Sequence, residues 1–508
     1  MAESWVNSAE RIGSDLHLEL SSAGSGGRRA AVVRALREAV RDGRLAPGTR
    51  LPPYRSLAAD LGVARNTVAD AYAELVAEGW LTARQGSGTR VALGVSAPPP
   101  PSRRRGGSAP AHDVPRAPRT ALPRARGPRH DLRQGTPDAS SFPRAAWLTS
   151  YRRALQQAPN EVFGPGDPAG RIELREALAE YLARARGVRT DPDRIVICSG
   201  FAHALRLLFG QGAGGTLRGP LAVEAYGLGF HRELLATAGV RTVPLPVDEH
   251  GALVAGLGRE RGVLLTPAHQ FPTGVPLHAE RRAAVIDWAR ARGGVVVEDD
   301  YDGEFRYDRK PVGALQGLDP DRVVLVGSVS KSLSPALRLG WMVLPRRYVG
   351  DVLAAKGERE AWASVPDQLC LADFMASGSY DRHVRRTRQR YRRRRDRLVE
   401  ALAARAPHIE VTGVAAGLHA VLRLPDGTER STVEAAGRRG VALDGLAAFR
   451  HPETGTAETG TAVTDTAVTG TAMTGTAVRD GLVVGYATPS DHAYGAAVEA
   501  LCGVLPPP

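Results

Sequence analysis

The stretch VVVEDDYDGEFRYDRKPVGALQGLDPDRVVLVGSVSKSLSPALRLGWMVLP, residues 295–345, contains two short apolar runs that each end in polar residues. The first run, 295–297, leads into three acids that include Asp299, and the second, 323–326, leads into a loop that contains Lys331. Short β-branched runs bounded by glycine and acids are typical of buried parallel strands. Polar residues at the ends of such strands lie where open α/β sheets bind ligands. The stretch therefore predicts an α/β domain with a ligand site.

The polar residues of this stretch suit one cofactor chemistry. A lysine beside a sheet forms a Schiff base with an aldehyde when its pKa is lowered, and Lys331 is the candidate. Asp299 suits a protonated pyridine nitrogen, and Tyr301 suits a phenolate oxygen. Three neighbours offer donors to a phosphate: Ser328, Ser330 and Arg338. Together these are the requirements of pyridoxal 5′-phosphate (PLP), although alone a loop lysine is usually solvated and an acid after a strand often caps a helix.

The segments EDDYDGEFRY and SVSKSLSPALRLGW resemble the fold type I aminotransferases. The resemblance implies that Lys331 is the catalytic residue that binds PLP, and that the turn at Gly200 and Phe201 holds its phosphate at a helix start. In TPAHQFPTGVPL, 266–277, it implies a polar contact to the ring oxygen, for which the sequence offers Gln270 or His269. Either Tyr226 or Leu228 packs over the ring. Strands expected at 194–198, 221–224 and 263–266 alternate with helices at 230–238 and 280–292, which predicts a mostly parallel sheet.

Composition sets the remaining limits. At 508 residues the chain is long enough for several domains, and its net charge of +13 with a pI of about 10.1 suits a nucleic-acid partner. A generally basic host proteome is the alternative reason for that charge. Its three cysteines form neither a metal-ligand spacing nor a disulfide framework, which favours a reducing cytoplasm and no metal site. No signal peptide or membrane span is expected, because no run approaches ~18 apolar residues.

A second pattern occupies the N-terminal part of the chain. Helical periodicity at 28–41 is followed by LPPYRSLAADLGVARNTVADAYAELVAEGWLTARQGSGTRV, 51–91. Its turn signals predict helices at 55–61 and 65–78 and a β-hairpin, which is the order of a winged helix-turn-helix. Arginine, asparagine and threonine at the start of a recognition helix suit guanine, adenine and a thymine methyl. The expected DNA contacts are Arg55, Arg65, Asn66 and Thr67 on the helices and Arg84, Gln85 and Gly86 at the wing.

This N-terminal segment resembles the GntR family of bacterial regulators through residues 28–92. It departs at Ala64, where the family commonly has Ser, so a helix N-cap worth ~1 kcal/mol is lost. Residues 1–27 are expected to be a flexible N-terminus. Residues 93–130 are expected to be a linker, because 97–130 contain nine prolines, eight arginines and one acid. A solvated tether is favoured there over an arm that touches DNA phosphates.

Two segments of the C-terminal part, 131–508, are compositionally biased. Residues 378–402 contain RHVRRTRQRYRRRRDRL and predict one long helix, for which a solvated face is favoured over a nucleic-acid face. Residues 454–478 repeat with period five and are expected to be a low-complexity insertion between two strands of a small domain. The 131–508 region as a whole is expected to be an aminotransferase-like PLP-binding domain.

The two resemblances on one chain define the MocR subfamily of GntR-type regulators. The fold class expected is multidomain: a mainly α winged helix-turn-helix with a β-hairpin, then an α/β fold type I domain with a large mostly parallel sheet and a small α+β domain. The resemblance implies a cytoplasmic homodimer, associated with the nucleoid, whose binding to a double-stranded operator responds to PLP or PLP with an amine or amino acid. Vitamin B6 genes are slightly favoured as targets. Two alternatives remain. A working aminotransferase that binds DNA is less favoured, because Val483 replaces the usual carboxylate-binding arginine and Arg450 or Arg479 would have to substitute. A regulator with a dead pocket is less favoured, because the expected pocket residues are all present.

Overall fold

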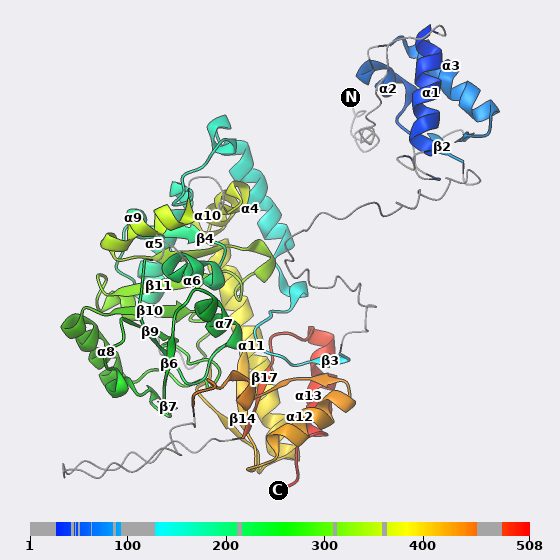
Figure 1. Ribbon diagram of the computed structural model, residues 1–508. Coiled ribbons are helices and arrows are strands. Elements are labelled where there is room, and N and C mark those ends of the chain that lie inside the picture. The colour runs from blue at the N-terminus through cyan, green and yellow to red at the C-terminus, as the bar shows by residue number, and fades with distance from the viewer. Residues whose placement is uncertain are drawn as a thin grey trace, which may run out of the picture. The chain divides into compact units, whose positions relative to one another are not determined.

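The computed structural model describes residues 27–41, 45, 47–48, 51–61, 63–84, 88–92, 128–210, 216–307, 312–357, 363–454 and 480–508. The chain divides into two compact units at Thr120 and Ala121, and each is described by itself (Figure 1). Nearly all of the expected N-terminal lead-in, linker and five-residue repeat lies outside the described residues, as do Gln85 and Gly86 and the side chain of Arg84. No helix of the described residues is long and apolar enough to cross a membrane.

The smaller unit is the predicted winged helix-turn-helix. Helices α1 (Gly27–Arg41), α2 (Tyr54–Asp60) and α3 (Arg65–Ala77) precede an antiparallel hairpin of β1 (Leu81–Arg84) and β2 (Gly88–Val91). Apolar residues of every element meet in one core, which includes Leu36, Leu57, Val68, Leu81 and Val91. The helix α3 begins without a side-chain cap at Ala64, as expected, although the Thr67 N–H donates to the Ala64 carbonyl at 2.9 Å.

The larger unit is built on a sheet of seven strands in the order β4-β12-β11-β10-β9-β5-β6. The strands are β4 (Ile195–Cys198), β5 (Leu221–Glu224), β6 (Thr242–Leu245), β9 (Gly262–Leu265), β10 (Val295–Asp300), β11 (Val323–Ser328) and β12 (Gly340–Val343). Only β12 runs antiparallel to its neighbours in this sheet. A parallel return needs a long crossover, and the connection 329–339 is too short for one. That connection therefore lies at the carboxyl end of β11 and carries Lys331 there.

Helices cover both faces of this sheet (Figure 1). One face packs against α4 (Arg144–Gln157), α5 (Ile172–Arg186), α10 (Val365–Ala376) and α8 (Ala279–Arg292). The other packs against α6 (Phe201–Phe209), α7 (Gly229–Thr237) and α9 (Arg346–Lys356). Successive residues of a strand alternate between the two cores, so that Leu325 faces the first and Val326 the second. The predicted three-layer α/β architecture is confirmed.

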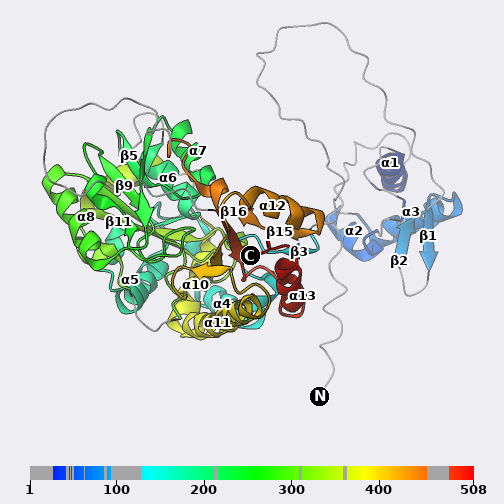
Figure 2. The same ribbon diagram turned by 90° about the horizontal axis from the view of Figure 1, so that it is seen from below.

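A small lobe follows, with the sheet order β13-β14-β17-β16. Its elements are β13 (Glu410–Thr412), β14 (His419–Arg423), β16 (Asp444–Gly445), β17 (Gly481–Gly485), α12 (Glu429–Arg438) and α13 (Asp491–Cys502). The predicted arginine-rich helix is α11 (Ser379–Arg405), which runs between the lobes in Figures 1 and 2. Its Tyr380 and Val384 belong to the core on the large sheet, whereas Leu398 and Leu402 belong to the core of the small lobe. The helix α11 thus joins the two cores.

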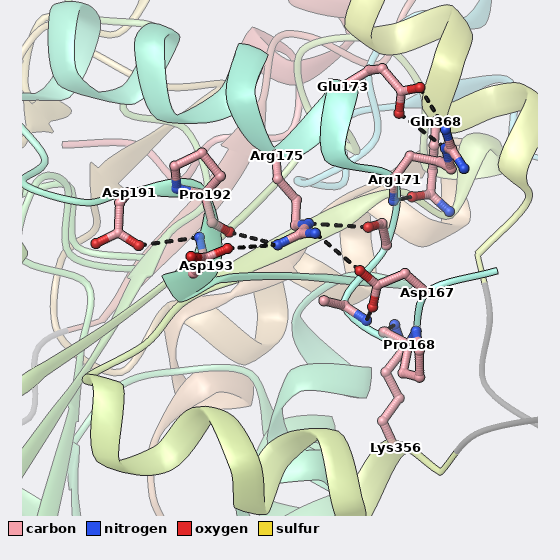
Figure 3. Close-up of polar contacts among 12 residues, drawn as sticks. Asp167, Pro168, Arg171, Glu173, Arg175, Asp191, Pro192, Asp193, Lys356 and Gln368 are labelled. Atoms are coloured by element: carbon pink, nitrogen blue, oxygen red, sulfur yellow. Dashed lines mark hydrogen bonds and ion pairs between the residues drawn. The ribbon is translucent and has the colours of Figure 1, made fainter. Parts of the chain in front are cut away.

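Two arginines of α5 bind to the chain beside the large sheet, one just before β4 and the other at the end of β10. Arg175 donates to the carbonyls of Gly170 and Pro192 at 3.1 Å and to Asp167 Oδ2 at 3.0 Å (Figure 3). At the other end of α5, Arg186 forms a buried two-point ion pair with Asp300, with N–O distances of 2.7 and 2.9 Å. These contacts hold α5 against the start of β4 and the end of β10.

Candidate functional site

A cavity of about 200 Å³ lies at the carboxyl ends of β10 and β11. Its wall contains eight of the nine residues predicted to bind the cofactor: Gly200, Phe201, Asp299, Tyr301, Ser328, Ser330, Lys331 and Arg338. These residues come from three separate parts of the chain, and the sheet topology brings them together. The position agrees with the general location of ligand sites in open α/β sheets.

Lys331 presents its amine to this cavity from the loop after β11. The ε-amino group donates to the backbone carbonyl of Gly135, where a Cβ would lie 3.2 Å from the nitrogen. Burial lowers the pKa of the Lys331 amine below its ordinary value, while the nearby carboxylates of Asp299 and Asp302 oppose that shift. A lowered pKa increases the fraction of neutral amine, which is the form that attacks an aldehyde.

Asp299 is the buried acid of the cavity. Burial raises the pKa of its carboxyl well above the usual value, and the neighbouring acids Asp300 and Asp302 raise it further, whereas Lys331 opposes the shift. A carboxyl in this setting becomes fully ionised only beside a further positive charge. A protonated pyridine nitrogen supplies such a charge, so this acid fits the ring of PLP.

The opposite part of the cavity suits a phosphate. Gly200 precedes α6 with φ of +102°, and a Cβ at Gly340 would lie 2.8 Å from the Gly200 Cα, so both positions need glycine. Because neither glycine has a side chain, an anion can approach the backbone N–H groups at the start of α6. Arg338 lines the same wall and is the only residue other than glycine with a positive φ among the described residues, at 51°. The serine hydroxyls of 328 and 330 complete a set of donors that fits a phosphate.

Gln270 does not belong to the cavity wall, although it was expected to contact the ring. Its amide nitrogen donates to Glu224 Oε2 at 3.2 Å and to the Tyr226 carbonyl at 3.0 Å. Its oxygen accepts from the Thr273 N–H at 3.1 Å. The side chain thus satisfies buried polar groups behind the wall, and Phe271 and Thr266 line the cavity instead. The other candidate, His269, is also buried behind the wall.

Several cavity residues were not found from the sequence. Both Tyr226 and Leu228 line the wall, so the choice between them is not exclusive. The His231 ring contacts the Phe201 ring at a tilt, with ring centroids 4.7 Å apart, and burial lowers the pKa of His231 to about 4. Burial also raises the pKa of Glu224 to about 7, opposed by hydrogen bonds from Thr266 and Gln270. Glu224 had a sequence signal, because it ends the predicted strand 221–224, whereas His231 lies in the predicted helix 230–238 and had none.

Among the described residues, no guanidinium takes the place of the carboxylate-binding arginine that Val483 replaces. Val483 is fully buried in an apolar cluster with Phe271 and Phe449. Arg450 does not line the cavity, and Arg479 lies outside the described residues. Arg232 does line it, but its guanidinium donates to the carbonyls of Gly227, Phe449 and Arg450 at 2.9–3.2 Å. Its contacts tie α7 to the small lobe.

The N-terminal end of α3 is the candidate DNA-reading surface. Arg65 and Asn66 are exposed there, and Thr67 is half-buried. The Arg65 guanidinium lies over the Tyr54 ring, 5.2 Å from its centroid, and is 3.3 Å from the Tyr54 hydroxyl. Arg55 is exposed beside them, and both arginines lower the pKa of Tyr54. The sequence did not single out Tyr54, which joins the starts of α2 and α3.

The chain matches two family models. Residues 28–91 match the bacterial regulatory proteins of the gntR family, and residues 131–455 match aminotransferase class I and II. The probable rhizopine catabolism regulatory protein MocR of Rhizobium meliloti is 34% identical over 71% of this chain and 74% of its own. This chain belongs to the MocR subfamily of GntR-type transcriptional regulators.

A further MocR-type relative is the HTH-type pyridoxine biosynthesis transcriptional regulator PdxR of Corynebacterium glutamicum. It is 30% identical over 82% of this chain and 88% of its own. Among solved structures, Pyrococcus horikoshii kynurenine aminotransferase matches 74% of this chain and 90% of its own, with a TM-score of 0.63 and 24% identity. The structural likeness confirms the fold type I architecture of the larger unit.

Proposed function

We propose that this MocR-type regulator binds PLP in the cavity and that PLP, or PLP with an amine or amino acid, controls its binding to DNA. The observation that supports this most strongly is the convergence of Lys331, Asp299, Tyr301 and Arg338 on one cavity beside the N-terminus of α6. These groups match the aldehyde, ring nitrogen, ring oxygen and phosphate of the cofactor.

Each residue has a separate part in this proposal. Lys331 binds the aldehyde carbon covalently, and its buried setting keeps the amine reactive. Asp299 holds the proton of the ring nitrogen, while Arg338 and the start of α6 hold the phosphate. When bound, PLP supplies an aldehyde that exchanges amines and a ring that withdraws electrons. Segments 200–201, 299–301 and 328–338 would together hold the bound group, so PLP would stabilise the arrangement of the larger unit in which these segments lie close together.

The DNA side of the proposal rests on α3. A helix-turn-helix dimer reads two half-sites one helical turn or a multiple apart, so we propose a homodimer at a paired operator. The pyridoxine biosynthesis regulator and the rhizopine regulator among its relatives support targets in vitamin B6 synthesis or in amine and amino-acid use.

The absorbance spectrum of the purified protein with PLP tests the cofactor site. We expect a visible band in the wild type, its loss in Lys331→Ala, and no change in the matched control Lys310→Ala. A band of unchanged shape and intensity in Lys331→Ala would overturn the assignment. Addition of candidate amines to the wild type then reports effectors as shifts of the band.

An active aminotransferase is the competing function. Transamination needs an anchor for the substrate carboxylate, since only an oriented substrate reacts quickly. The buried Val483 and the carbonyl-bound Arg232 both argue against such an anchor in the described residues. Mixing of the PLP-loaded protein with an L-amino acid, first alone and then with a 2-oxo acid as amino-group acceptor, decides between the two: one equivalent of keto acid without the acceptor and steady turnover with it would favour the enzyme.

A further inference from the structure

Behind Tyr301 lies a buried acid–imidazole pair that the proposed function does not use. His269 Nδ1 is 2.8 Å from Asp302 Oδ2, and each side chain is only 2% exposed. The Tyr301 hydroxyl oxygen is 2.9 Å from the same Nδ1 atom. Tyr301 lines the cavity, whereas His269 and Asp302 do not. The three side chains therefore connect the protein interior to the cavity wall.

The pair is packed tightly from the side of the small lobe. Gly417 has φ of +73°, and a Cβ there would lie 2.4 Å from His269 Cε1 and 2.6 Å from Asp302 Oδ2. The Gly417 carbonyl accepts a hydrogen bond from the Tyr486 hydroxyl at 2.9 Å, which fixes this backbone. The His419 ring lies against the imidazole with centroids 5.4 Å apart. These contacts hold the imidazole beside Asp302.

The hydrogen-bond inventory limits where the protons lie once Asp302 is taken as ionised. An ionised Asp302 only accepts, so His269 Nδ1 must carry a proton and donate it to the carboxylate. A protonated Nδ1 has no lone pair for the Tyr301 hydroxyl, which then offers its oxygen, not its proton, to the imidazole. The opposite tautomer would place two lone pairs 2.8 Å apart in a buried site. The tyrosine proton then has two acceptors to choose between, a group in the cavity and the Asp302 carboxylate, whose hydrogen bond adds to burial in raising the pKa of Tyr301.

We propose that the His269–Asp302 pair is a positioning element that directs the Tyr301 proton into the cavity, toward the ring oxygen of the cofactor. This inference rests on the proposed PLP site. The acid acts through the imidazole by fixing its tautomer, as carboxylates behind functional histidines do elsewhere. Its consequence is spectroscopic, because a donor at the ring oxygen favours the more negative form of the chromophore.

The test is a pH titration of the visible absorbance of the full-length, PLP-loaded protein. Loss of the donor in Tyr301→Phe removes stabilisation of the deprotonated form, so the pH midpoint rises by about one unit. Asp302→Asn is expected to shift the midpoint in the same direction. The double variant Tyr301→Phe/Asp302→Asn isolates the charge of Asp302, which raises the pKa of Lys331 against the effect of burial, so it is expected to differ from Tyr301→Phe alone only by a small downward shift of the midpoint.

Controls separate positioning from general electrostatics. Glu304→Gln removes a half-buried acid of the same segment, which accepts a hydrogen bond from the Tyr380 hydroxyl at 3.2 Å, and it should leave the midpoint unchanged. His269→Gln is the second variant and should shift the midpoint as Asp302→Asn does. The other titratable groups that face the three side chains stay the same in all variants: Glu224, Asp299, Lys331 and His419.

Two results would overturn the inference. Additive shifts in the double variant would mean that Asp302 acts on the chromophore by charge alone. An unchanged midpoint in both Asp302→Asn and His269→Gln, with Tyr301→Phe shifted, would mean that the pair does not direct the proton. Absence of any visible band in the wild type would instead overturn the proposed cofactor site, and the inference with it.

Discussion

At the scale of single residues, the sequence pointed to residues that line the cavity where these residues lie close together in the chain. Asp299 and Tyr301 follow one strand and Ser328 to Lys331 follow the next, so the end of a strand places each of them. Gln270 does not line the cavity, because sequence spacing does not determine the direction in which a loop side chain points. His231 and His419 were missed because their parts of the chain carry no motif, and only the folded sheet brings them to the cavity.

The amine of Lys331 provides the first prediction. Burial lowers its pKa from the ordinary 10.5, so the rate of PLP attachment, measured by stopped-flow absorbance against pH, should have its midpoint below that value. Asp299 raises the pKa of Lys331 through its charge, and Asp299→Asn should therefore move the midpoint further down. Glu304→Gln should leave it in place. A midpoint at or above the ordinary value in the wild type would show that the amine is solvated.

At the scale of elements, the bounds agree with the sequence expectations to within a few residues at each end, because apolar periodicity and turn residues are local signals. The pairing of β12 was not evident locally. Its antiparallel direction depends on the length of the connection from β11 and on the space beside β4. The side-chain periodicity of a strand is the same in either direction, so no pattern within 340–343 carries that information.

The start of α3 supports a prediction on DNA reading. Arg65→Ala should weaken binding to a duplex selected from a random pool by ~1–3 kcal/mol, if its guanidinium contacts a base. The control Arg29→Ala removes the same charge from α1, where the side chain faces Glu74 at 3.5 Å. Titration by fluorescence anisotropy at fixed salt compares the two. Equal losses in both variants would indicate a non-specific charge effect, and specific binding by a 93–508 fragment would move the reading surface elsewhere.

The helix α11 supports a prediction on cooperativity, because it contributes to the cores of both lobes. Leu398→Ala removes a fully buried side chain from the small lobe and should cost ~2–5 kcal/mol. If α11 couples the lobes, hydrogen exchange should accelerate equally in β11 of the large sheet and β14 of the small one. The exposed Arg392→Ala on the same helix is the control and should change neither. Acceleration confined to β14 would show that the lobes unfold independently.

At the scale of the whole molecule, the DNA-reading helix and the cavity belong to separate compact units, each with its own core. A ligand shifts a conformational equilibrium only through different affinities for the two states. In the proposed site, PLP would be held by segments 200–201, 299–301 and 328–338 of the larger unit. We therefore expect the coupling to pass either through docking of the smaller unit on the larger one or through dimer geometry.

This argument gives the last prediction, which compares DNA with one half-site and with two. Two half-sites read by one dimer must match the spacing that the dimer geometry permits. PLP should therefore change the affinity of full-length protein for two-site DNA much more than for one-site DNA, measured at fixed salt because phosphate contacts depend on salt. Lys331→Ala should remove the difference. Equal changes on both duplexes would exclude dimer geometry as the route. No change on either, with Lys331 occupied, would mean that the bound cofactor is structural and that another molecule is the effector.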